Sequence, residues 1–174
     1  LVELDFSKND SITGNVPDFA NLPKLEKLYL SHNKLSGSIP DFTNFPVLRV
    51  INLAFNELTD TVSNFTNLPN LKEFNFTNNQ LTGSVPNFDS LPNLIKISLA
   101  NNQLTDTIPV FTNLPNLEKL NLSGNQLTGH IPDLPNLKNF VLFSNQLTSV
   151  ATLTNTSYLE TFKINYNQLL LVFV

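Results

Sequence analysis

A pattern of leucine and polar positions repeats along the chain, with asparagine at a fixed place in every copy. The segment Leu117–Leu122 reads LEKLNL, in which Leu120 and Leu122 alternate with polar residues. Alternation with a period of two predicts a short strand with one buried face. The phrase L-x-x-L-x-L-x-x-N-x-L-T-G-x-I/V-P-x-F-x-x-L-P-x recurs eight times, its asparagines spaced by 24, 23, 23, 23, 23, 20 and 22 residues. One unit cannot bury its apolar face alone, so the pattern predicts stacked units that cover one another.

The repeat sets the domain organisation. We expect a single domain over residues 1–174, with units beginning at Leu1, Leu25, Leu48, Leu71, Leu94, Leu117, Leu137 and Leu159. No capping segment with a polar outer face is recognisable at either end. Uncapped solenoids expose a cross-section of their core. The termini are therefore candidates for end-to-end self-association, the apolar LLLVFV at Leu169–Val174 among them.

The recurring asparagines have a structural role that follows from their chemistry. A short amide side chain can donate to and accept from backbone groups in the turn after each strand. We expect the stacked amides to be buried, Asn9 included, and to satisfy main-chain groups that a buried loop would leave unpaired. This ladder consists of Asn9, Asn33, Asn56, Asn79, Asn102, Asn125, Asn145 and Asn167.

Two more positions recur in register. Glycine follows a Leu-Thr, Leu-Ser or Ile-Thr pair where a turn demands positive φ, and aspartate, which tolerates that region, replaces it in two units. These residues are Gly14, Gly37, Gly83 and Gly129, with Asp60 and Asp106 as the replacements. Phenylalanine recurs later in the unit and should form an aromatic spine beneath the convex side. The spine consists of Phe19, Phe42, Phe65, Phe88 and Phe111.

The whole phrase resembles the leucine-rich repeat family, over essentially the entire chain. Its LTGxIP half, as in LSGSIP at Leu35–Pro40 and LTGHIP at Leu127–Pro132, is similar to the plant subclass of receptor ectodomains and polygalacturonase-inhibiting proteins. FTNLPN at Phe65–Asn70 departs from the usual plant consensus, and similar repeats occur in bacterial and protist surface proteins. The resemblance implies a right-handed curved solenoid, with a parallel β-sheet on the concave side and loops or short 3-10 turns on the convex side.

Composition limits the classes of function that the chain can have. The net charge is −4 and no basic residues cluster, which argues against nucleic-acid binding. No apolar run approaches the roughly 20 residues of a transmembrane helix, and without cysteine there is no thiolate metal site. His32 and His130 lie in separate units, away from carboxylates at metal-ligand spacing and from any Ser-His-Asp set. We expect no metal, no cofactor and no catalysis.

The candidate function is recognition on the concave side. Leucine-rich repeat proteins commonly bind partners there, so the resemblance implies a non-catalytic module for a protein or glycan partner, extracellular or at a cell surface. The candidate contact residues are Tyr29, Asn52, Asn75, Asn121, Val141, Phe143, Lys163 and Tyr166. Exposed aromatic residues gathered in one place indicate an interface, and we expect Val141, Phe143 and Tyr166 to cluster.

Two alternatives remain open. Regular Thr and Asn positions could recognise ice, although turn chemistry alone also explains these residues. One ladder is Thr43-Asn44, Thr66-Asn67 and Thr112-Asn113, and a second is Thr59, Thr82 and Thr105. The other alternative is a structural spacer within a longer surface adhesin.

Overall fold

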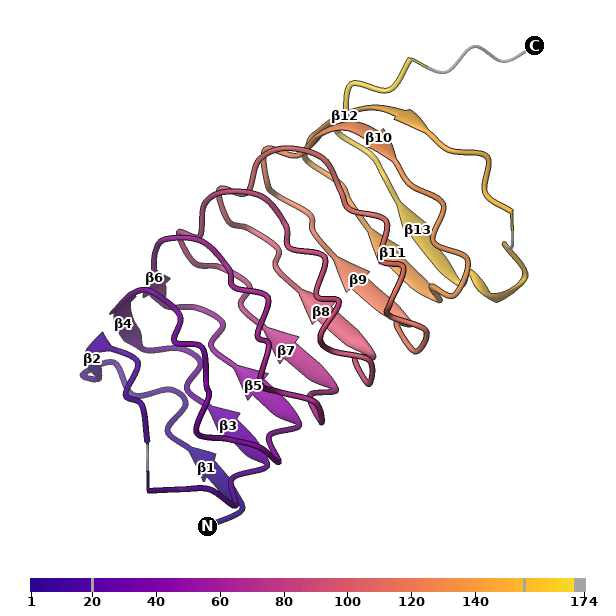
Figure 1. Cartoon of the computed structure of the whole chain (residues 1–174). Helices are drawn as coiled ribbons and strands as arrows, with labels where there is room; N and C mark the ends of the chain where they lie inside the picture. The colour runs from indigo at the N-terminus through magenta and orange to yellow at the C-terminus, as the bar shows by residue number, and fades with distance from the viewer. Residues whose placement is uncertain (20, 155, 171–174) are drawn as a thin grey trace.

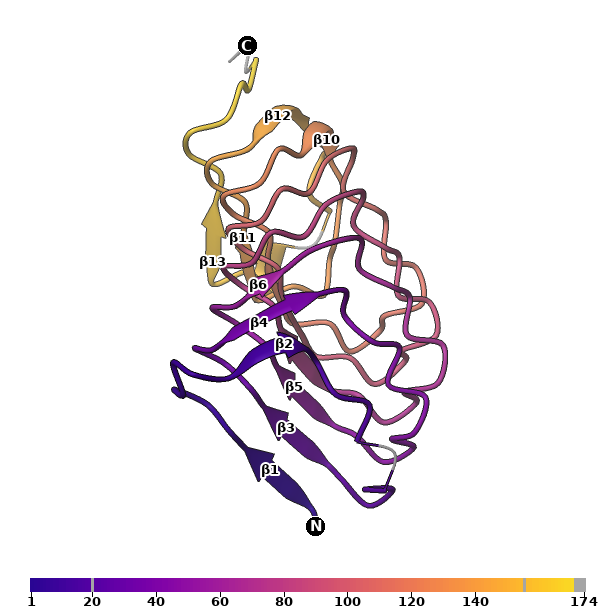
Figure 2. The same cartoon turned by 90° about the vertical axis from the view of Figure 1, so that its left-hand side faces the viewer.

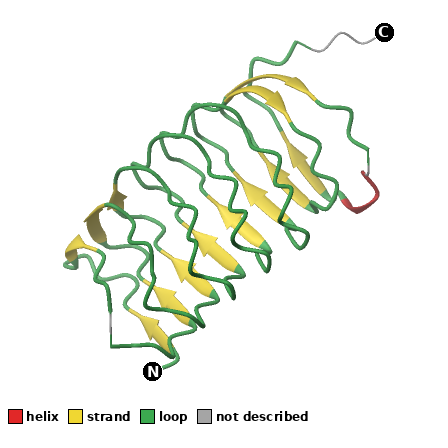
Figure 3. Ribbon diagram, in the orientation of Figure 1, coloured by secondary structure: helices red, strands yellow, loops and turns green. Residues whose placement is uncertain are grey.

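The units stack in sequence order into a solenoid. The structure, a computed structural model, describes residues 1–19, 21–154 and 156–170, so 171–174 of the apolar C-terminal segment lie outside the described residues. Figure 1 shows one coil after another between the two ends, and Figure 3 shows that the coils consist of strands and loops. The 3-10 helix η1 (Thr156–Tyr158) is the only helix in the described part. The convex side otherwise consists of loops and turns in the described part, as expected.

One parallel sheet of eight short strands runs the length of the solenoid, as predicted, and each unit supplies one strand. Neighbouring strands pair in register, for example Leu28 with Ile51 and Phe74 with Ile97, so the inward apolar residues form continuous rows. The strands are β1 (Glu3–Asp5), β3 (Lys27–Tyr29), β5 (Val50–Asn52), β7 (Glu73–Asn75), β8 (Lys96–Ser98), β9 (Lys119–Asn121), β11 (Asn139–Val141) and β13 (Thr161–Lys163).

Two smaller parallel sheets, which the sequence did not predict, follow the main strands along the coils. Figure 2 shows β2, β4 and β6 stacked on one another beside the main sheet. The bridges Thr61–Thr82 and Ser84–Thr105 continue this pairing through the middle of the solenoid. The first small sheet contains β2 (Thr13–Asn15), β4 (Lys34–Gly37) and β6 (Glu57–Leu58), and the second contains β10 (Thr128–Ile131) and β12 (Gln146–Val150).

The core lies between the main sheet and the convex turns. Phe65 and Phe88 are 1% and 0% exposed, and their rings stack with a centroid separation of 6.5 Å. Phe42 and Phe111 extend this row to either side at 6.1 and 6.4 Å, which confirms the aromatic spine over four units. Phe19 is only half-buried. Large apolar rings buried in this way are a major contribution to the stability of a core.

The asparagine ladder joins adjacent units. Asn102 is 8% exposed, its Nδ2 donates to the carbonyls of Phe76 and Leu99 at 3.1 Å each, and its Oδ1 accepts the N–H of Leu81 at 3.0 Å. Asn125 Nδ2 also donates to Leu99 O, so that carbonyl receives one amide from each of two units. The expectation that Asn9 is buried is wrong: it is exposed, because among the described residues it lies in the first unit of the stack and is covered from one side only.

Backbone conformation follows the repeat. The predicted positive φ holds at Gly14, Gly37, Gly83 and Gly129 and also at Asp60 and Asp106. The residue before each ladder asparagine is left-handed too, which turns the chain at the end of the strand so that the asparagine faces inward. This column, with φ between 53° and 66°, consists of Lys8, His32, Phe55, Asn78, Asn101, Gly124, Ser144 and Tyr166.

Side chains of one unit explain the residue at the glycine position of the next. A Cβ on Gly83 would lie 2.8 Å from Thr61 Cγ2, and a Cβ on Gly129 would lie 3.0 Å from Thr107 Cγ2. Where the preceding unit carries a smaller serine, Ser38 or Ser84, the corresponding residue is the aspartate. The alternation of glycine and aspartate is therefore coupled to the neighbour's size.

Candidate binding surface

The outer side of the main sheet, called here the concave face, presents one central side chain from each strand. Strand register pairs Tyr29 with Asn52, Asn52 with Asn75, and Ser98 with Asn121. It also pairs Asn121 with Val141 and Val141 with Lys163. Six of the eight predicted contact residues therefore lie in one row, called here the central row: Tyr29, Asn52, Asn75, Asn121, Val141 and Lys163. All are half-buried except Lys163, which is exposed.

The three asparagines of the central row have a fixed orientation. Asn52 Oδ1 accepts the backbone N–H of Ala54, and Asn75 Oδ1 accepts that of Thr77, both at 3.1 Å. Asn121 Oδ1 accepts the N–H of Ser123 at 3.1 Å and its hydroxyl at 2.7 Å. A backbone N–H can only be bonded by the amide oxygen, so the NH₂ groups are the ends left for a ligand.

Two shallow hollows lie along the central row. The larger, of about 250 Å³, is lined by Tyr29, Val50, Ile51, Asn52, Glu73, Phe74, Asn75 and Lys96. The smaller, of about 160 Å³, is lined by Lys96, Ile97, Ser98, Lys119, Leu120, Asn121, Asn139 and Val141. Both combine a floor of sheet residues with polar side chains, which is the composition of a site that fixes a ligand's orientation through a few polar groups.

Charged side chains flank the central row. Lys27 bonds Glu3 at 2.9 Å, and Lys96 lies 3.9 Å from Glu73 on the neighbouring strand. The hydrogen bond that Lys27 donates to Glu3 raises the pKa of Lys27 above its ordinary value. Lys119, also exposed, has no ion pair within the described part of the chain. The surface therefore carries both paired and uncompensated cations.

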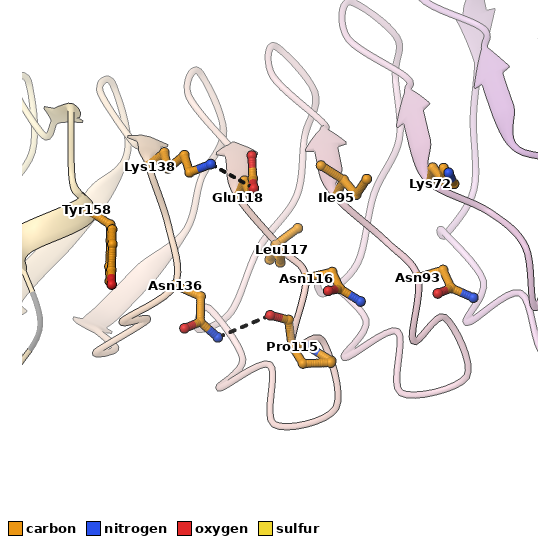
Figure 4. A pocket seen from close by; sticks show the side chains of 10 residues that line it. All are labelled: Lys72, Asn93, Ile95, Pro115, Asn116, Leu117, Glu118, Asn136, Lys138 and Tyr158. Atoms are coloured by element: carbon orange, nitrogen blue, oxygen red, sulfur yellow. Dashed lines mark hydrogen bonds and ion pairs between the residues drawn. The ribbon is translucent and has the colours of Figure 1, made fainter.

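A third hollow, about 390 Å³, lies at the edge where the chain enters the main strands (Figure 4). Lys138 bonds Glu118 at 2.8 Å there, which raises the pKa of Lys138, and Tyr158 stands beside them, 61% exposed. A second asparagine ladder lines this edge: Asn93 Nδ2 donates to Pro69 O at 2.9 Å, and Asn70, Asn116 and Asn136 repeat the contact. Sequence reasoning missed this ladder, although the recurring Leu-Pro-Asn was its signal.

The remaining two predicted contact residues lie outside the central row. Phe143 follows β11 and is half-buried, while Tyr166 occupies a left-handed turn position and is 79% exposed. Among the described residues no ring contact joins them. The stacked exposed pair is instead His32 with Phe55, whose ring centroids are 4.2 Å apart with planes 10° from parallel. This pair was not predicted, because the two residues are 23 positions apart and adjacent only through the stack.

Within the described ranges, one histidine lies beside a serine, but no third group orients it. His130 Nδ1 lies 2.9 Å from Ser149 Oγ in an exposed pair, and the described residues give His130 no other polar contact. A nucleophile needs a base that is itself oriented by a third group. No three His, Cys, Asp or Glu residues of the described ranges are grouped to hold a metal ion. Within those ranges no helix is long and apolar enough to cross a membrane.

Comparison with family profiles matches residues 1–44 and 92–133 to "Leucine Rich repeats (2 copies)" and residues 70–91 to "Leucine Rich Repeat". Comparison with curated protein sequences finds no match.

Solved structures of related shape come from plants and from a bacterium. The plant peptide hormone receptor RGFR1 in complex with RGF2 is 32% identical, with a TM-score of 0.81 over 90% of this chain and 27% of that chain. A plant ice-binding protein is 27% identical, with a TM-score of 0.81 over 97% and 65%. Listeria monocytogenes InlP is 35% identical, with a TM-score of 0.70 over 86% and 44%. The chain thus spans less than two thirds of each of these proteins.

Proposed function

The chain belongs to the leucine-rich repeat family, and on that basis we propose that it is a non-catalytic recognition module that binds a peptide or protein segment on its concave face, outside the cell or at a cell surface. The observation that carries the proposal is the central row, which lines two adjoining hollows on a rigid parallel sheet. Support also comes from RGFR1, a similar structure solved with the peptide RGF2.

The physical case rests on free donors over a preformed surface. The amide NH₂ groups of Asn52, Asn75 and Asn121 have no acceptor within the described residues, and their oxygens are held by the backbone. A segment of peptide supplies carbonyl acceptors for such donors. Because the side chains are already oriented, little conformational entropy is lost on binding.

A matched pair of substitutions tests the location. A random peptide library is panned against the immobilised chain, and the affinity of the best peptide is measured by calorimetry. Val50→Trp fills the larger hollow, whereas Val110→Trp makes the same change at an exposed site, 59% exposed, away from the main strands. We expect Val50→Trp to weaken binding at least about tenfold and Val110→Trp to leave it unchanged. Equal effects, or no enriched peptide, would contradict the proposal.

Ice binding is the second candidate, favoured by a specific regularity. Thr43, Thr66 and Thr112 are exposed in successive convex turns, interrupted in one unit by Asp89 and Ser90. The similarity to a plant ice-binding protein over 97% of this chain supports it further. Thr82 is exposed in the second ladder, while Thr59 and Thr105 are half-buried.

Thermal hysteresis and ice-crystal shape separate the two candidates. Ice binding predicts faceted crystals with the wild-type chain, and their loss with Thr66→Lys or Thr82→Lys. Asn75→Lys on the concave face is the control and should leave the crystals faceted. Unshaped discs with the wild-type chain would exclude this candidate.

A further inference from the structure

The smaller hollow of the concave face differs in chemistry from its surroundings. Three adjacent strands contribute two rows of side chains: Lys96, Lys119 and Asn139 in one, and Ser98, Asn121 and Val141 in the other. No carboxylate lines it. Its charged groups are two ammonium ions, and Asn121 adds an amide NH₂ whose orientation is fixed by Ser123. Hydrogen-bond donors therefore dominate the lining.

The two lysines lie side by side without a shared counter-ion. Lys96 and Lys119 are register partners on neighbouring strands, and like charges placed opposite each other destabilise a sheet. Glu73 approaches Lys96 from the other side at 3.9 Å, and Glu118 is engaged by Lys138 at 2.8 Å. Lys119 itself has no partner within the described ranges. An anion between the two lysines would relieve this repulsion.

Charge is distributed unevenly around the solenoid. The segments from the second to the eighth residue of each unit, which contain the main strands, hold eight of the ten Lys and Arg residues but six of the fourteen Asp and Glu residues. The whole chain is nonetheless acidic, at −4. An acidic ligand is therefore attracted to the side of the main sheet and repelled elsewhere.

We propose that the smaller hollow is a carboxylate-binding subsite, in which Lys96, Lys119 and the Asn121 amide receive an aspartate or glutamate side chain of the bound peptide. This inference rests on the proposed function and names a chemical requirement for its ligand. Ammonium and amide donors to a carboxylate form charge-assisted hydrogen bonds, which are stronger than neutral ones. A uronic acid would also bring several hydroxyl donors, which this donor-rich lining matches less well than a peptide side chain.

The test is an NMR titration of the isotope-labelled chain at constant ionic strength. Two blocked pentapeptides are compared, one with aspartate and one with asparagine between flanking glycines, and trigalacturonate is the third probe. We expect saturable shifts of the Asn121 and Asn139 side-chain amides with the aspartyl peptide alone. Lys119→Gln should weaken this binding about fivefold, the effect of one partly exposed ion pair. Lys72→Gln, which removes a lysine outside the hollow, should leave it unchanged.

Each other outcome overturns the subsite. Equal shifts with the two peptides would show that charge is not recognised, and shifts that Lys119→Gln leaves intact would place the anion elsewhere. Stronger saturable binding of trigalacturonate would assign the hollow to an acidic glycan instead. If the panned peptide still binds in a Val50-dependent way while the aspartyl peptide does not, the recognition role stands and the carboxylate subsite is wrong.

Discussion

Replacing a central rung of the asparagine ladder should destabilise the protein far more than replacing the first one. In Asn102→Ala the N–H of Leu81 loses its acceptor, while Phe76 O keeps the amide of Asn79 and Leu99 O keeps that of Asn125. One buried donor is therefore orphaned, at a cost of about 1–3 kcal/mol, and three carbonyls, those of Phe76, Leu99 and Ala100, each lose one of two bonds. We expect a total of about 2–4 kcal/mol.

Asn9→Ala is the matched control, since it is the same substitution in the same column. Asn9 is exposed, and its amide donates to Phe6 O and Ser7 O, which water can solvate. Its loss should cost under about 1 kcal/mol. Equilibrium unfolding in urea gives both values, and hydrogen exchange of the Leu81 amide reports the orphaned donor directly. Equal destabilisation by the two substitutions, or unchanged exchange at Leu81, would refute the argument that the cost arises from a buried donor left without an acceptor.

Three further predictions concern packing and charge. Gly83→Ala should destabilise more than Gly14→Ala, because only Gly83 has a neighbour in the way, and adding Thr61→Ser should recover part of the loss in a double-mutant cycle measured in urea. Phe88→Ala should cost about 3–5 kcal/mol by the same measurement, as expected for a fully buried ring. The raised pKa of Lys138 means that its stabilising contribution is fully present below the unfolded pKa of about 10.4 and is lost as pH rises through the folded value. Unfolding midpoints of Lys138→Gln should therefore fall less steeply above about pH 10 than those of the wild type or of Lys72→Gln.

Periodicity could predict the elements that every unit repeats. The main strands, the asparagine ladder and the positive φ of Gly83 and Asp106 all follow from residues that recur at fixed places in the unit. The left-handed residue before each ladder asparagine could not be predicted, because Phe55, Ser144 and Tyr166 have no common chemistry there. Stacking of the coils imposes that turn, and the local residue conforms to it.

The candidate site also contains some features that the sequence predicts and others that it does not. Alternation places side chains correctly while the strand continues, so the central row from Tyr29 to Lys163 follows from the sequence. Tyr166 lies after the strand has ended, where alternation no longer applies. The pairing of His32 with Phe55 and the juxtaposition of Lys96 and Lys119 depend on contacts between units, which require the register of the sheet.

The asparagines of the central row combine structure and recognition in one side chain, and a substitution can separate the two. In Asn75→Asp a carboxylate oxygen still accepts the N–H of Thr77, so the free energy of unfolding should stay within about 0.5 kcal/mol of wild type. The same change removes the outward NH₂ donor, so the panned peptide should bind more weakly. Asn75→Ala removes the acceptor as well and should lower both stability and affinity. Urea unfolding and calorimetry measure the pair, and undiminished peptide affinity in Asn75→Asp would show that this donor does not contact the ligand.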